Sequence, residues 1–140
     1  MTRINIIDPF ELSDQHLMAE YREITMVPAA LRRSLRTRSV PDILKGIPTR
    51  FTLNAGHVTF FYDKLSYLKE RYQRLQLELI DRGVEIDLDR EFDIADLPQI
   101  FHGSYQPDEA AAAVIRRRIA EKIAMKPQWY RWTRGSHGAN

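Results

Sequence analysis

The 140-residue chain contains no cysteine, which excludes disulfide bonds and thiolate metal sites. Its four histidines are scattered and do not reach metal-ligand spacing, so we expect no metal and no cofactor. The sequence also lacks an apolar run of the roughly 18 to 20 residues that a membrane span needs, and its amino end lacks a basic region followed by an apolar one. These absences predict a soluble, cytoplasmic protein that does not contact membranes.

Charge is small in total but unevenly distributed along the chain. The net charge is +2 and 44% of the residues are hydrophobic, which suits one domain over residues 1–140. Residues 29–50 carry six basic residues and one acidic, 84–109 carry one basic and eight acidic, and 114–134 carry seven basic and one acidic. This segregation would let one face meet a polyanion while another is repelled. From charge alone, nucleic-acid binding and an ordinary solvated surface are equally favoured.

Hydrophobic periodicity predicts an all-α fold, a single domain of three main helices with long packed loops. The first helix is expected over residues 14–38, with a kink between Ile24 and Pro28 because proline lacks a backbone donor and crowds the preceding turn. A connecting loop without a recognisable motif is expected over residues 39–53.

Two further helices are expected beyond this loop. Over residues 58–82, apolar side chains recur at spacings of three and four until Gly83 ends the pattern. Asp108 is expected to cap a helix over 108–125 that ends before Pro127. Residues 84–106 between them show no sustained helical period and are expected to form a loop, and residues 135–140 are expected to be disordered. The side chains expected to pin the long loop to the core are Phe92, Ile94, Leu97, Ile100 and Phe101.

In a helix, the segment DQHLMAEYRE at residues 14–23 would have a polar stripe that could carry chemistry beside an apolar stripe that packs on the core. His16, Glu20 and Glu23 share one stripe of a helix, at spacings of four and three. The adjoining apolar stripe consists of Leu17, Tyr21 and Ile24. Taken alone, Glu23 is more often a solvated surface carboxylate than a catalytic one.

The amino end, MTRIN, supplies a possible nucleophile. A small residue at position 2 lets Met1 be removed, which leaves Thr2 with a free α-amino group. The pKa of such an amine is about 7.7 to 8.0, against about 10.4 for lysine, so far more of it is neutral at pH 7. Attack of this amine on a sugar carbon gives a Schiff base, and a nearby carboxylate such as Glu23 can stabilise the cationic transition state. Many unrelated chains, however, begin with Met-Thr.

The carboxyl-terminal region combines cations with aromatic side chains. Arg118 and Lys122 are four residues apart on one face of the predicted third helix, a spacing suited to consecutive phosphates. The residues that follow alternate aromatic and basic side chains, namely Trp129, Tyr130, Arg131, Trp132 and Arg134. Aromatic faces stack on bases, although Trp129 alone could equally fill a hydrophobic core.

Four blocks together resemble the pyrimidine-dimer DNA glycosylase family: MTRIN, DQHLMAEYRE, AGHVTFFYDKL at 55–65, and EKIA followed by WY. The resemblance runs from Met1 to about Arg131. It implies a DNA repair enzyme that cleaves the glycosidic bond at the 5′ base of a cyclobutane pyrimidine dimer and then nicks the strand by β-elimination, both through one covalent imine. The implied partner is double-stranded DNA with ultraviolet lesions or abasic sites, and we expect a monomer.

The resemblance also assigns roles to individual residues. It makes the α-amino group of Thr2 the nucleophile and gives Glu23 the carboxylate that stabilises the imine and serves the elimination. The residues matched to the DNA-contacting side are Arg3, Gln15, His16, Arg22, Arg118 and Lys122, to which we add Trp129, Tyr130 and Arg131. The family kinks its duplex and expels a base opposite the lesion, at a cost of several kcal/mol that phosphate contacts help offset.

The chain departs from the family pattern at three positions. Met26 stands where the family carries an arginine, and Pro28 is a second departure on the same helix. Trp132 lies in the carboxyl-terminal tail, which is rich in tyrosine in the type member of the family. These departures leave two alternatives open. One is a lyase of the same family that acts on oxidised bases or abasic sites, and the other is a helical DNA-binding module without turnover.

Overall fold

The computed structural model describes residues 2–134, which form helices and one isolated antiparallel bridge between Lys64 and His102. The α-helices are α1 (Asp14–Glu23), α2 (Met26–Leu35), α3 (Val40–Lys45), α4 (His57–Phe60), α5 (Leu65–Asp81) and α6 (Glu109–Met125), and 3-10 helices lie at η1 (Pro9–Glu11) and η2 (Gln99–Phe101). The predicted all-α fold is confirmed. The predicted disorder of residues 135–140 lies outside the described part of the chain.

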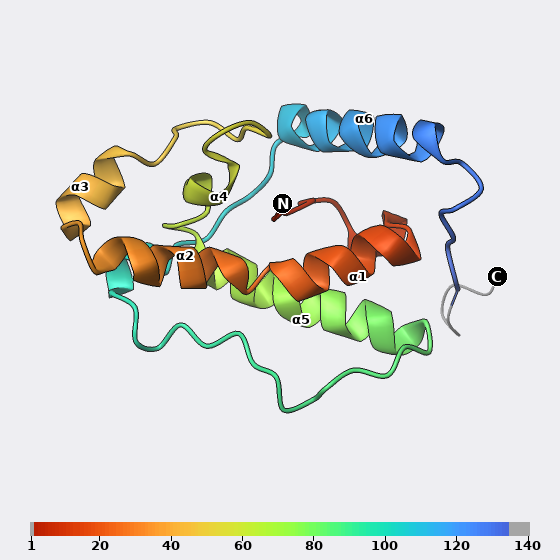
Figure 1. Cartoon of the computed structure of the whole chain (residues 1–140), viewed down its shortest axis with the longest axis horizontal. Helices are drawn as coiled ribbons and strands as arrows, with labels where there is room; N and C mark the ends of the chain where they lie inside the picture. The colour runs from red at the N-terminus through yellow and green to blue at the C-terminus, as the bar shows by residue number, and fades with distance from the viewer. Residues whose placement is uncertain (1, 135–140) are drawn as a thin grey trace.

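The helices surround the amino-terminal segment (Figure 1). α1 packs against α5, and α2 contacts α3 and α4. In Figure 1, residues 2–7 run between α1 and α6, and the carboxyl-terminal segment returns past the start of α1. Ile4, Ile6 and Ile7 are buried in the shared hydrophobic core and Asn5 is buried between them, so this part of the amino-terminal segment is an interior element.

The predicted first helix is in fact two helices, and the break falls at the predicted kink. The Ile24 N–H still donates to Glu20 O at 2.8 Å, but Ile24 O then accepts from Val27 N–H at 3.3 Å. Pro28, which stands four residues after Ile24, has no N–H with which to continue the α-helical pattern. The second half ends at Leu35, and the loop predicted after it contains α3, which Ser39 caps by accepting from Asp42 N–H at 3.2 Å.

The prediction of one helix over residues 58–82 was wrong, because the chain turns at 61–64 between α4 and α5. Asp63 O accepts from Gly103 N–H at 3.1 Å, and Tyr67 N–H donates to Gly103 O at 3.3 Å. A Cβ at Gly103 would lie 2.2 Å from Asp63 O, so only glycine allows this approach. The end of α5 follows the prediction: Gly83 has φ of 84°, its N–H donates to Ile80 O at 2.9 Å, and Val84 N–H donates to Leu79 O at 3.0 Å.

The last helix and the long loop largely match their predictions. Asp108 caps α6 by accepting from Ala111 N–H at 2.7 Å. Of the side chains expected to pin the loop, four are buried, but Ile100 is 58% exposed because it lies on the outer side of η2 while Phe101 takes the core position. Within residues 2–134, no helix is long and apolar enough to cross a membrane.

Candidate nucleic-acid site

Two buried polar groups hold the amino-terminal segment in place. His57, at the start of α4, accepts the Ile4 N–H through Nε2 at 2.9 Å and donates from Nδ1 to Thr52 O at 2.8 Å. Burial lowers the pKa of His57 to about 4, so the ring is neutral at pH 7 with one nitrogen free to accept. One residue further on, the Asn5 N–H donates to Glu20 Oε1 at 3.1 Å.

Glu20 is itself fixed by a buried ion pair with Arg71 of α5. Arg71 donates from Nε to Glu20 Oε2 and from Nη2 to Glu20 Oε1 at 3.0 Å, and both side chains are 1% exposed or less. Arg71 Nη1 also donates to Ile7 O at 2.8 Å. A buried ion pair is stable only when its other donors and acceptors also have hydrogen-bond partners. Because the bonds of Glu20 meet this condition, we assign Glu20 a structural role. Glu23, the next carboxylate along the stripe, is only half-buried.

Thr2 contacts the first turn of α2, where the chain has just left α1. Its hydroxyl donates to Met26 Sδ at 3.4 Å, and Met26 is the first residue of α2, three residues after Glu23. Burial and then the charge of Arg118 lower the pKa of Arg3, while the charge of Glu23 acts in the opposite direction. Arg3 therefore lies within the electrostatic reach of both Glu23 and α6.

A basic pocket opens between the amino-terminal segment, α1 and α6. Its lining residues are Arg3, Asn5, His16, Arg118, Ile119 and Lys122. Burial, followed by the charge of Lys122, lowers the pKa of His16, which favours the neutral ring. The predicted stacking of Arg118 and Lys122 on one face of α6 thus brings both cations to the same pocket as Arg3.

A second pocket lies beside the first and shares His16 with it. It is lined by Asp14, Gln15, His16, Met18, Ala19, Arg22, Trp129 and Tyr130. The rings of His16 and Tyr130 stack at 4.8 Å with an angle of 9° between their planes, and Trp129 meets Tyr130 edge-on at 5.0 Å. Trp129 is 56% exposed, so it does not fill the core.

The carboxyl-terminal segment is fastened to the start of α1 by Gln15. Its side-chain Nε2 donates to Trp129 O at 2.6 Å, and its Oε1 accepts the Arg131 N–H at 3.1 Å. The Asp14 N–H donates to Arg131 O at 2.7 Å. Both polar ends of the Gln15 side chain are therefore engaged with this segment, and Arg131 is held through its backbone while its side chain is exposed.

The two adjoining pockets bring together the predicted DNA-contacting residues other than Arg131, whereas Thr2 and Glu23 line neither pocket. A face that combines these cations and aromatic rings can bind phosphates and stack bases. Within residues 2–134, no group of His, Asp or Glu side chains is arranged to hold a metal ion.

Sequence reasoning missed the residues that support this face. His57 precedes the helix predicted over residues 58–82 and was given no role, and the role of Arg71 was not foreseen. One available signal was that Arg71 falls between Leu68 and Leu75 on the apolar stripe of α5, a position where a cation is buried and needs a partner.

A known protein family matches the part of the chain that contains the amino-terminal segment and helices α1 to α5. Residues 1–92 of the 140 match the family model for pyrimidine dimer DNA glycosylase.

Proposed function

The chain belongs to the pyrimidine dimer DNA glycosylase family, whose members act in the repair of DNA, and we propose that it is a bifunctional glycosylase and abasic-site lyase. In this proposal it cleaves the glycosidic bond at the 5′ base of a cyclobutane pyrimidine dimer and then nicks the strand. Its substrates are double-stranded DNA with ultraviolet lesions or abasic sites, and it acts as a monomer in the cytoplasm.

The proposed nucleophile is the α-amino group of Thr2, exposed by removal of Met1. The amine displaces the base from C1′ of the sugar, and opening of the sugar ring leaves a protonated imine between C1′ and the amine. Removal of a C2′ proton then expels the 3′ phosphate by β-elimination. Glu23 stabilises the positive charge of the imine and accepts the proton.

The placement of Thr2 is the observation that carries this proposal. The segment that ends in Thr2 is held internally by His57 and by Glu20, and its Thr2 hydroxyl contacts Met26 at 3.4 Å, beside the turn of α1 that presents Glu23. In the proposed mechanism the amine reacts beside the Glu23 carboxylate, and a segment fixed in this way would need little reorganisation to react, which is the advantage of an oriented intramolecular arrangement.

The surrounding side chains supply the binding contacts. Arg3, Arg118 and Lys122 line one pocket and are placed to contact phosphates, and Arg22 lines the adjoining one. Trp129 and Tyr130 offer aromatic faces to an unstacked base. Together these contacts would offset the several kcal/mol needed to kink the duplex and extrude a base.

A lyase restricted to abasic sites is a second candidate. Met26 is 53% exposed and contacts Thr2, so an uncharged side chain occupies the position where an arginine would add a phosphate contact. Comparison of irradiated with abasic plasmid separates the two activities, because a restricted lyase would nick only the abasic plasmid.

Nicking of ultraviolet-irradiated supercoiled DNA tests the proposal. Glu23→Gln preserves shape and removes the charge, so we expect loss of nicking with lesion binding retained. Glu70→Gln is a matched control, because Glu70 is an exposed carboxylate on α5. Nicking by Glu23→Gln at the rate of the unchanged protein would contradict the proposed mechanism, and no nicking by the unchanged protein would favour a binding module.

A further inference from the structure

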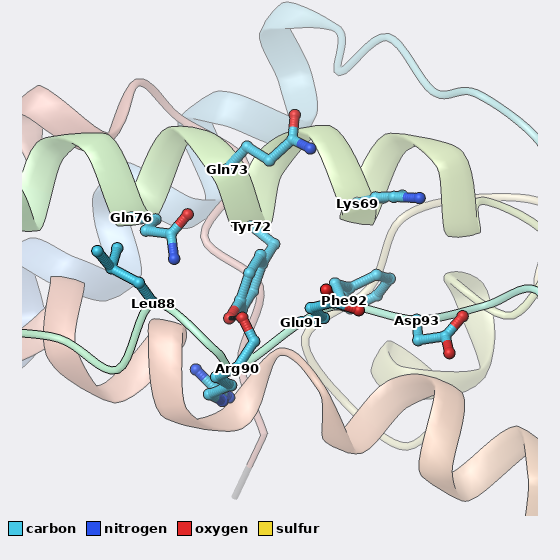
Figure 2. A pocket seen from close by; sticks show the side chains of 9 residues that line it. All are labelled: Lys69, Tyr72, Gln73, Gln76, Leu88, Arg90, Glu91, Phe92 and Asp93. Atoms are coloured by element: carbon cyan, nitrogen blue, oxygen red, sulfur yellow. Dashed lines mark hydrogen bonds between the residues drawn. The ribbon is translucent and has the colours of Figure 1, made fainter.

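Arg90 is the only basic residue between positions 84 and 109, yet its side chain reaches back to the junction of α1 and α2. Its Nη1 donates to Tyr21 O at 2.8 Å, and its Nη2 donates to Arg22 O and to Thr25 Oγ1, each at 3.1 Å. Figure 2 shows Arg90 on the loop that faces α5, beside the pale red ribbon of the first helices.

These acceptors belong to the end of the helix that carries Glu23. The last carbonyls of an α-helix have no partner within the helix and form the negative end of its dipole, so a cation that donates to them stabilises the final turn. Tyr21 and Arg22 are the two residues before Glu23, the last residue of α1. Arg90 therefore fixes the backbone from which the Glu23 side chain projects, and through Thr25 it also fixes the start of the turn into α2.

The guanidinium group of Arg90 is itself held in place. It lies 4.5 Å from the centre of the Tyr21 ring and 5.3 Å from that of Tyr72, and the Tyr72 hydroxyl donates to Arg90 O at 2.9 Å. The hydroxyls of Tyr21 and Tyr72 lie 3.2 Å apart. Backbone and side chain of Arg90 are thus both anchored between α1 and α5, which makes its donors a fixed support.

The surroundings of Arg90 argue against a direct contact with DNA. Arg90 lines two pockets, and neither is the basic pocket of Arg3. One also contains Lys69, Glu91 and Asp93, and the other contains Glu85 and Asp87 and shares Met18 and Arg22 with the pocket of Trp129 and Tyr130. In each pocket the acidic side chains balance the basic ones, and the Arg90 donors are already engaged by Tyr21, Arg22 and Thr25, so Arg90 offers little to a phosphate.

We propose that Arg90 is a positioning residue for Glu23, which acts through the carbonyls of the last turn of α1 and does not touch the substrate. This inference rests on the proposed role of Glu23. It predicts that loss of the guanidinium group slows the chemical step while leaving DNA binding unchanged.

The test compares Arg90→Ala with Arg32→Ala. Arg32 also ties the acidic loop to the α1–α2 unit, through a bidentate pair with Asp96 at 2.7 and 2.8 Å, but it lies nine residues beyond Glu23. We expect Arg90→Ala to lower kcat for abasic DNA by about 10- to 100-fold, the scale of loss that follows from a small misplacement of a catalytic group. KM and the salt dependence of DNA binding should not change, and Arg32→Ala should keep the kcat of the unchanged protein.

Chemical rescue separates positioning from a general loss of folding. Removal of the Arg90 side chain leaves a space that borders both pockets, so millimolar guanidinium ion should restore part of the kcat of Arg90→Ala, whereas the same concentration of sodium chloride should not. Arg90→Lys should recover little, because an ammonium group cannot reproduce the planar fork that donates to two carbonyls and a hydroxyl.

Several outcomes would overturn the inference. They are an unchanged kcat in Arg90→Ala, an equal loss in Arg32→Ala, an absence of rescue by guanidinium, or a shallower salt dependence, which would make Arg90 a phosphate contact. If Glu23→Gln is inactive and Arg90→Ala fully active, only the role of Arg90 fails. If Glu23→Gln is fully active, the proposed function fails first.

Discussion

A lower pH should reduce the free energy of unfolding of the protein, because it favours protonation of His57. The Nε2 atom accepts the Ile4 N–H at 2.9 Å and the Nδ1 atom faces Thr52 O at 2.8 Å, so a second ring proton would point at a donor. The rings of Phe51 and Phe61 meet the imidazole edge-on at 5.5 and 5.4 Å. Protonation therefore requires the amino-terminal segment to detach.

The size of the effect follows from the pKa. In the unfolded chain His57 takes up its proton near the ordinary pKa of 6.5, whereas burial lowers the pKa in the folded protein to about 4. Between these values the unfolded state binds more protons, so stability is intact above pH 6.5 and falls as the pH is lowered. At about 1.4 kcal/mol for each pH unit, the free energy of unfolding should drop by about 2 kcal/mol between pH 7.5 and 5.

Urea unfolding at pH 7.5 and pH 5 measures this loss. In His57→Gln, the side-chain oxygen can still accept the Ile4 N–H but does not titrate, so the loss should shrink by about 2 kcal/mol. The pKa of His16 is also lowered by burial and by Lys122, and His16→Gln gives its separate contribution of the same sign. An equal loss of stability in His57→Gln and in the unchanged protein would show that His57 is not the group that takes up the proton.

Three further predictions concern the support of the site and its contacts with DNA. Glu20→Gln should lower the free energy of unfolding by about 3 kcal/mol or more in urea titrations, because it leaves the buried charge of its partner on α5 uncompensated; a near-neutral change would contradict the structural role of Glu20. Arg118→Ala and Lys122→Ala should each make the slope of log K against log salt shallower by about 0.9 and weaken binding to damaged and plain duplex alike; a selective loss for damaged DNA would mean that they read the lesion. Gln15→Ala should speed trypsin cleavage after Arg131 and reduce the preference for damaged DNA, since both polar ends of the Gln15 side chain hold that segment; unchanged cleavage would argue against this anchoring.

The parts of the fold that could be predicted depend on local chemistry. Pro28 lacks an N–H, Gly83 adopts a positive φ, and Asp108 offers a capping oxygen, so each marks a helix end within a few residues. The turn at 61–64 could not be predicted in this way. It depends on hydrogen bonds with Gly103, which is some forty residues further along the chain.

The same distinction holds for the site. Arg118 and Lys122 could be placed on one face because helical spacing fixes their relation. The carboxylates of Glu20 and Glu23 share a helical stripe, and only the tertiary partner Arg71 shows that Glu20 is committed to structure. The contact of Arg90 with the end of α1 likewise joins residues far apart in sequence, so no local pattern indicates it.

In the proposed mechanism, the α-amino group of Thr2 forms the covalent intermediate. Incubation with abasic DNA in the presence of borohydride should reduce the imine and leave a stable protein–DNA adduct, and peptide mapping by mass spectrometry locates the bond. We expect an adduct on the α-amine of Thr2 in protein that has lost Met1. An adduct mapped to a lysine such as Lys122, or full activity in protein that retains Met1, would contradict it.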